Sequence, residues 1–204
     1  MAEIFEYRGC EGLVYAEVTT DDNETEGGYV TGEVKPLAGV AEIGKTTETS
    51  SETHYYDNAP AIIINSTGSD EITISASAIP LDVLAEITGQ DYDVNTGTLI
   101  EGDRQLKYFA LGYVTKKSNG ELVYVWRYKG TFNIPDSTHV TENDGTDANG
   151  QELTYTGIAT THKFEKTGKR AKAINVDLGQ DKADVTTFFD AVTTPDTLKA
   201  KSVA

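Results

Sequence analysis

The chain has 204 residues, of which 38% are hydrophobic and 25% are charged, and its formal net charge is −16 at pH 7. So acidic a balance excludes a protein that grips nucleic acid through a basic face. Cys10 is the single cysteine, so no internal disulfide can form, and the class of small disulfide-stapled secreted domains is excluded as well.

The N-terminal sequence MAEIFEYRGCEG contains neither a basic segment nor an apolar one, so we expect no signal peptide. No stretch approaches the roughly 20 consecutive apolar residues of a membrane-spanning helix, and we expect no contact with a membrane. The length suits one large domain or two small ones, and it is sufficient to bury a sizeable core.

The first expected strand is Leu13–Val18, and a long acidic loop over residues 19–33 follows it. The next segment contains GVAEIGKT (39–46), which fits the phosphate-binding pattern G-x-x-x-x-G-K-[ST]. That motif needs a helix directly after it, but the following residues are rich in Thr and Ser, which form helices poorly. We therefore interpret residues 40–56 as a strand that ends at the turn sequence DNAP.

Apolar residues return in Ala61–Asn65, which we interpret as a short buried strand, and Ser66–Glu71 as a turn after it. Residues Ile72–Ile79 alternate apolar side chains with Ser and Thr, which predicts a strand with one solvated face. The period then changes to that of a helix over Leu81–Ile87, and Gly89 is placed to end it. A helix this short must dock on a sheet to be stable.

The clearest local signal is Asn119-Gly120, the preferred pair of a type I′ hairpin turn, between two apolar runs. With these two residues as the loop, Tyr113 faces Trp126 across the hairpin, on a face rich in aromatic side chains. An aromatic stripe of this kind is typical of a hydrophobic core. We therefore expect four aromatic residues of this hairpin in the core, namely Tyr113, Tyr124, Trp126 and Tyr128.

A polar loop over residues 141–152 precedes the last elements. It resembles a calcium-binding loop but has no carboxylate at the first and last ligand positions, so we expect no calcium there. Residues 153–164 and 173–178 are expected as strands. Apolar residues at i, i+3, i+4 and i+7 predict a second short helix over Val185–Val192.

These elements together predict a mainly β fold, an antiparallel β-sandwich or barrel with one or two short α-helices on its flank. We expect one domain over residues 1–204. Within it we distinguish an N-terminal arm over 1–35, a β-sandwich core over 36–195 and a C-terminal tail over 196–204.

No group of residues points to catalysis or to a bound cofactor. The three histidines, His54, His139 and His162, have no spacing typical of a zinc site, and no serine lies in G-x-S-x-G. The acidic residues are many but scattered, so no catalytic pair can be chosen. We expect no enzyme, no catalytic residue, no cofactor and no metal site.

Several segments are notable for the order in which they occur, namely PLAGVAEIGKT, YYDNAP, IPLDVLAEITG, FALGYVTKKSNGELVYVWRYKGTFNIPD, TYTGIAT and FFDAV. Each segment alone is weak evidence, but the ordered set resembles the major tail protein (tail tube protein) family of long-tailed, siphovirus-type bacteriophages. The resemblance extends from PLAGVAEIGKT to FFDAV and so covers most of the chain.

The resemblance implies a structural virion protein that self-assembles into hexameric rings, stacked into the tail tube through which DNA passes during ejection. Its partners would be further copies of itself, the tape-measure protein, and the tail terminator and baseplate proteins. DNA would pass through the tube without adhering to its wall. The protein would be found in the phage tail, after assembly in the cytoplasm of the bacterial host. Strand edges that a monomer must protect would serve assembly instead.

Residues 44–53 are rich in Thr and Ser and have two polar faces, which does not fit an ordinary half-buried strand. In a tube, such a strand could line a hydrated lumen. Alternation places Glu42, Glu48 and Glu52 on one face of it. We predict that these three glutamates face the lumen, where their charge repels DNA.

Two other classes of function compete with this one. A monomeric β-sandwich binding module, for carbohydrate or for adhesion, would use an exposed aromatic pair such as Tyr55 and Tyr56. A nucleotide hydrolase would use the pattern at residues 39–46, but the strand interpretation of that segment speaks against it.

Overall fold

The computed structural model describes residues 4–23, 28–141 and 149–201. Strands make up 55% of the described residues, which also contain one α-helix and one short 3-10 helix, and this confirms the mainly β fold. The strands of the main sheet are β1 Tyr7–Asp21, β2 Tyr29–Thr31, β3 Lys35–Pro36, β4 Val40–Tyr56, β5 Ala59–Ala76, β8 Phe109–Lys117, β9 Leu122–Phe132, β10 Asp136–Ser137, β11 Gln151–Ile158 and β12 Ala173–Asp177. The other elements are α1 Leu81–Thr88, β6 Asp91–Asp93, β7 Thr98–Ile100, the 3-10 helix η1 Leu178–Gln180, β13 Ala183–Asp184 and β14 Lys199–Ala200.

The main sheet is antiparallel and follows the order β2-β1-β8-β9-β11-β5-β4. The long strand β9 has two successive partners, because β12 pairs with its residues 123–127 and β11 with its residues 129–132. The sheet therefore divides at β9 into one branch through β11 and another through β12.

The strand expected at Leu13–Val18 is part of β1, which pairs with β8 over most of its length. Residues Leu13, Tyr15 and Ala16 of β1 are buried. The division that set residues 1–35 apart as an arm was therefore wrong for β1. This strand lies inside the sheet between β2 and β8, with Leu13 and Tyr15 in one hydrophobic cluster and Ala16 in another.

Two hydrophobic cores lie on opposite faces of β8 and β9. Tyr113 and Val125 belong to the first core, whereas Trp126 and Tyr128 belong to the second, with Tyr124 packed beside them. Because neighbouring residues of a strand point to opposite faces, a strand covered on both sides is apolar along most of its length, as β9 is. The four aromatic residues thus lie in or against two cores, and the single aromatic face that we predicted was wrong.

The register of the β8–β9 hairpin explains this difference. Tyr113 pairs with Val125 and Gly112 with Trp126, one residue away from the predicted pairing. The loop has three residues, because the Lys117 N–H donates to the Glu121 carbonyl at 2.8 Å and Gly120 has a positive φ of 93°. A shift of one residue moves every side chain to the other face.

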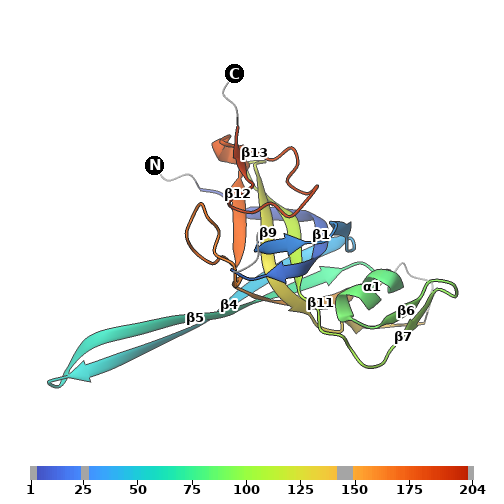
Figure 1. Cartoon of the computed structure of the whole chain (residues 1–204), viewed down its shortest axis with the longest axis horizontal. Helices are drawn as coiled ribbons and strands as arrows, with labels where there is room; N and C mark the ends of the chain where they lie inside the picture. The colour runs from blue at the N-terminus through green and yellow to red at the C-terminus, as the bar shows by residue number, and fades with distance from the viewer. Residues whose placement is uncertain (1–3, 24–27, 142–148, 202–204) are drawn as a thin grey trace.

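The helix α1 has the expected position. Gly89 ends it in a left-handed conformation, with φ at 71°, and its N–H reaches the carbonyls of Ala85 and Glu86. Leu84 and Ile87 point into the first core. The helix, with β6 and β7 beside it, lies at one end of the sheet (Figure 1).

The second helix, predicted over Val185–Val192, does not form, and this segment is a series of turns. The Phe188 carbonyl accepts hydrogen bonds from Trp126 Nε1 at 2.9 Å and Thr193 Oγ1 at 3.0 Å. A helix would use this carbonyl for its own ladder. Phe188 and Val192 are nevertheless buried in the second core, as their spacing suggested.

The segment 40–56 is the strand β4, which confirms the strand interpretation of GVAEIGKT. Asp57 and Asn58 both have positive φ and form the tight turn to β5, as type I′ turns require. Two other predictions in this region were wrong. Residues 66–71 continue β5 instead of turning, and residues 61–65 form a strand that is exposed, not buried.

Candidate assembly surface

The most unusual feature of the molecule is the outer part of the β4–β5 hairpin, residues 48–69, which we call the distal hairpin. It projects away from the remainder of the chain, which we call the body (Figure 1). Thr, Ile and Tyr favour extended conformations, and Ser50 and Ser66 are hydrogen-bonded across the two strands at 2.9 Å. An isolated two-stranded hairpin is only marginally stable in water, so this segment needs a further partner.

The distal hairpin exposes apolar side chains where a monomer would normally have polar ones. Ile63 is 63% exposed and Tyr55 is 66% exposed. A cluster of exposed apolar residues on one element marks a surface for another molecule. Its members are Tyr55, Tyr56, Ile62, Ile63 and Ile64.

The three glutamates predicted to face a lumen, Glu42, Glu48 and Glu52, are all exposed on β4. The register shift near Thr47 adds a residue to β5 and not to β4, so alternation along β4 keeps the three carboxylates on one face. The face is acidic, because the sequence contains no Lys or Arg from residue 46 to residue 103.

The hairpin is tied to the body where the distal hairpin begins. Asp70 of β5 is buried, and it accepts hydrogen bonds from Arg127 Nη1 of β9 and from Lys172 Nζ, each at 3.0 Å. Thr47 Oγ1, on the neighbouring strand β4, donates to the same carboxylate at 3.0 Å. Lys172 Nζ also donates to the Gly68 carbonyl. This root cluster, Thr47, Asp70, Arg127 and Lys172, determines where the hairpin leaves the body.

The electrostatics of the root cluster favour an ionised Asp70. Burial by itself would raise the pKa of this carboxyl, but the hydrogen bonds from Lys172 and Thr47 and the positive charges of Lys172 and Lys45 lower it overall. Removal of either partner of such a buried pair leaves a charge without compensation. The cluster is therefore a buried network that attaches the hairpin to the body, and it differs in this from an ordinary surface ion pair.

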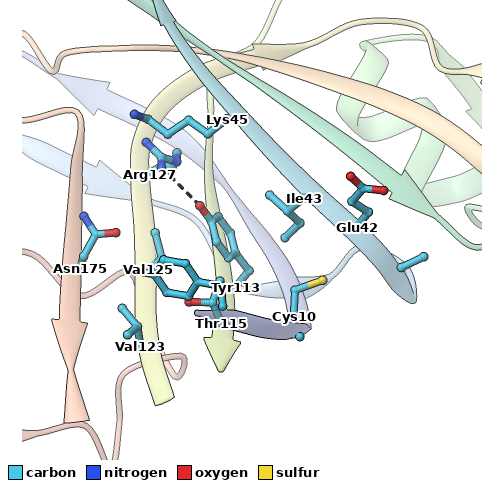
Figure 2. A pocket seen from close by; sticks show the side chains of 13 residues that line it. Cys10, Glu42, Ile43, Lys45, Tyr113, Thr115, Val123, Val125, Arg127 and Asn175 are labelled. Carbon is cyan, nitrogen blue, oxygen red and sulfur yellow. Dashed lines mark hydrogen bonds between the residues drawn. The ribbon is translucent and has the colours of Figure 1, made fainter. Parts of the chain in front are cut away.

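An open cavity of about 470 Å³ lies beside the root cluster, between β1, β4, β8, β9 and β12 (Figure 2). Its wall includes apolar groups such as Ile43 and Val125, and also the cations Lys45 and Arg127. Figure 2 shows Ile43 and Lys45 on the cavity side of β4, with Glu42 directed away from it. The Nε of Arg127 is buried and has no hydrogen-bond partner among the described residues.

Sequence reasoning missed the root cluster and the exposure of the isoleucines. Asp70 and Lys172 are far apart in the chain, so no local pattern connects them. For the isoleucines a signal was available, because Ala61–Asn65 lies inside a long segment without any Lys or Arg. An ordinary protein surface carries charges of both signs, so this absence sets the segment apart.

The part of the chain that the structure describes shows no group of three or more His, Cys, Asp or Glu side chains arranged to hold a metal ion. The calcium-like loop lies largely outside the described residues. No helix within the described ranges is both long and apolar enough to cross a bilayer.

Comparison with known protein families identifies a match. The family model described as "Phage tail tube protein" matches residues 46–189, which include the distal hairpin and most of the body. None of the curated proteins compared matches this chain.

Proposed function

The chain belongs to the phage tail tube protein family, and on that basis we propose that its copies assemble into hexameric rings that stack into a DNA-conducting tube. Membership makes it a structural protein of the virion tail and not an enzyme. It also sets aside the two other classes, the monomeric binding module and the nucleotide hydrolase. Family membership gives the structural role in the tail, whereas six subunits in a ring and the stacking of rings are what we propose.

The observation that carries the proposal is the distal hairpin. A strand pair that exposes Ile62, Ile63 and Ile64 to water has a surface that only another molecule can cover. Full burial of one such side chain stabilises by roughly 1.5–3 kcal/mol. Contacts repeated between many identical copies would then give a long assembly its stability.

The edges of the sheet support self-assembly as well. The sheet ends at β2 on one side and at β4 on the other, and among the described residues β4 pairs only with β5. A free edge of this length invites pairing with another strand. Addition of a neighbour's strand is a common mode of recognition, and here the neighbour would be a second copy.

We further propose that the acidic face of β4 lines the lumen. Six copies of Glu42, Glu48 and Glu52 per ring would place a dense negative charge around the channel. DNA carries a charge of the same sign at short intervals, so it would pass without adhering. The repulsion extends over roughly 8 Å at physiological salt, so only side chains that face the channel contribute.

The proposed partners are therefore other copies of this chain, the tape-measure protein inside the growing tube, and terminator and baseplate proteins at its two ends. The test is electron microscopy of the purified chain over a range of concentrations. We expect six-fold rings and hollow tubes. A chain that stays monomeric at every concentration, with and without a tape-measure protein, contradicts the proposal.

The lumen assignment has its own test, in phage particles built from the variant chain. Conversion of Glu42, Glu48 and Glu52 to Lys leaves tube formation intact and slows DNA ejection, most strongly at low salt, where screening is weakest. The control converts three exposed glutamates of the body, Glu33, Glu101 and Glu165, to Lys, with the same change in net charge. Equal ejection rates for both variants refute the assignment.

A further inference from the structure

The cavity beside the root cluster has the character of a binding site with no occupant within the same chain. Its volume of about 470 Å³ is in the range of sites that enclose a ligand. Apolar walls with a few polar groups are typical of such sites. Arg127 lines the cavity, and its buried Nε has no hydrogen-bond partner among the described residues, which costs about 1–3 kcal/mol.

The charge around the cavity is unusual for this molecule. Three cations, Lys45, Arg127 and Lys172, gather at the root, where Asp70 is the carboxylate that they share. Glu42 borders the cavity but is directed away from it (Figure 2). In a chain with a net charge of −16, this local excess of positive charge favours an acidic occupant.

The tip of the hairpin is acidic and aromatic, and so complements the charge and the apolar walls of the cavity. Tyr55 and Tyr56 are 66% and 60% exposed, and Asp57 follows them in the tight turn. No Lys or Arg occurs in the hairpin beyond Lys45, so the whole tip is acidic. A tyrosine ring provides a large apolar surface and a polar end, which suits a cavity with apolar walls and cationic groups.

We propose that the hairpin tip of one copy, Tyr55 to Asp57, inserts into the root cavity of a second copy. The proposal rests on the self-assembly proposed above and specifies one of its contacts. Tip and cavity lie at opposite ends of the same hairpin, so the contact is head-to-tail: each copy offers its tip to the next and receives one from the previous. A head-to-tail contact that does not close on itself generates an open array, as a growing tube requires.

This contact limits the spacing of copies along the array. From Lys45 to Asp57 the strand spans about 40 Å at ~3.3 Å per residue. The repeat along the tube is therefore no longer than this. A longer repeat measured on assembled tubes overturns the proposal.

Cys10 permits a direct test, because the single cysteine of the chain lines the cavity. Replacement of Ala59 by Cys places a second thiol beside the tip, at an exposed position next to the turn. Tubes of the full A59C chain are oxidised with diamide, or treated with a short bis-maleimide, and separated on a non-reducing gel. We expect a ladder of covalent oligomers that contains most of the protein.

Two controls make the result specific. Addition of Cys10→Ser to A59C abolishes the ladder, and Glu101→Cys, an exposed cysteine on the body, gives at least tenfold less product. Tubes that form normally but yield no Cys10-dependent ladder with either reagent refute the tip-to-root contact and leave the tube function intact. Failure of the unmodified chain to form tubes contradicts the proposed function itself.

Discussion

The body and the distal hairpin share two strands yet differ in what stabilises them. Ile72 and Ile74 of β5 are fully buried in the first core, whereas Ile62 and Ile64 of the same strand are half exposed. The residue type is the same, and the strand is continuous. The body therefore contains the interactions that keep it folded, while the distal hairpin depends on contacts outside its own chain. Stability and assembly can accordingly be altered separately.

The largest effect on stability is expected in the second core of the body. Trp126 is fully buried, and its Nε1 donates to the Phe188 carbonyl at 2.9 Å. Trp126→Ala should lower the free energy of unfolding by about 3–5 kcal/mol, because it leaves a cavity and removes one of the two hydrogen bonds that the Phe188 carbonyl accepts. Guanidinium unfolding followed by far-UV circular dichroism measures the change. Trp126→Phe, which keeps most of the volume, should cost less, and a loss below 1 kcal/mol for the Ala variant contradicts the assignment.

The next effect is expected at the joint between the two regions. Asp70→Asn keeps the shape of the side chain but leaves Arg127 and Lys172 without their carboxylate. Breaking a buried pair in this way costs roughly 3 kcal/mol. Urea unfolding at pH 7 measures the loss.

The loss of stability in Asp70→Asn should also depend on pH, and the direction of this dependence follows from the pKa of Asp70. The pKa of Asp70 is lowered in the folded protein, so its contribution is fully present above the unfolded value, about 3.9. The contribution is lost as the pH falls through the lower folded pKa. The difference between wild type and Asp70→Asn should therefore shrink in strong acid, and a constant difference from pH 7 to pH 2 contradicts it.

A smaller effect is expected at Gly112, which lies opposite Trp126 on β8. A Cβ at this position would lie 2.8 Å from the Trp126 ring and equally close to Val14. Gly112→Ala should cost about 1–3 kcal/mol through overpacking. Gly44→Ala is the matched control, because a Cβ there meets no atom closer than 4.0 Å. Equal losses of unfolding free energy for Gly112→Ala and Gly44→Ala contradict the pairing of Gly112 with Trp126.

This position also shows where prediction from sequence reached its limit. The Asn119-Gly120 pair correctly indicated a hairpin, but it fits loops of two and of three residues. Register is normally decided by which face is buried, and β9 has buried residues on both faces. The close approach of the Trp126 ring, which leaves no room for a Cβ at position 112, accounts for the glycine there. It depends on the packing of Trp126, which no local pattern contains.

The candidate assembly surface was predictable to a similar degree. The acidic face of β4 follows from alternation, because Glu42, Glu48 and Glu52 share one parity. Burial, however, depends on whether another element covers a strand, and Ala61–Asn65 has the composition of a buried strand without such a cover. The root cluster depends on contacts between residues distant in sequence. The late segment around Phe188 had the spacing of a helix, but Trp126 and Thr193 take the carbonyl that a helix needs.

The smallest effect on stability, and the sharpest separation of the two regions, is expected in the distal hairpin. Ile63 is 63% exposed in the free chain, so Ile63→Ser should change the free energy of unfolding by no more than about 0.5 kcal/mol. In a tube the same side chain would be covered by a neighbour, and its loss should cost roughly 1.5–3 kcal/mol per contact. That corresponds to an increase of about tenfold to a hundredfold in the concentration needed for assembly.

Sedimentation of tubes at a series of concentrations, beside urea unfolding of the free chain, measures both quantities for this variant. Ile100→Ser is the matched control, because Ile100 is 54% exposed on the body. It should change neither quantity, since nothing places Ile100 on the distal hairpin. If the two serine variants assemble alike, the exposed isoleucines are ordinary surface residues. If Ile63→Ser unfolds the free chain, the distal hairpin is part of the body's own stability, and the separation between the two regions fails.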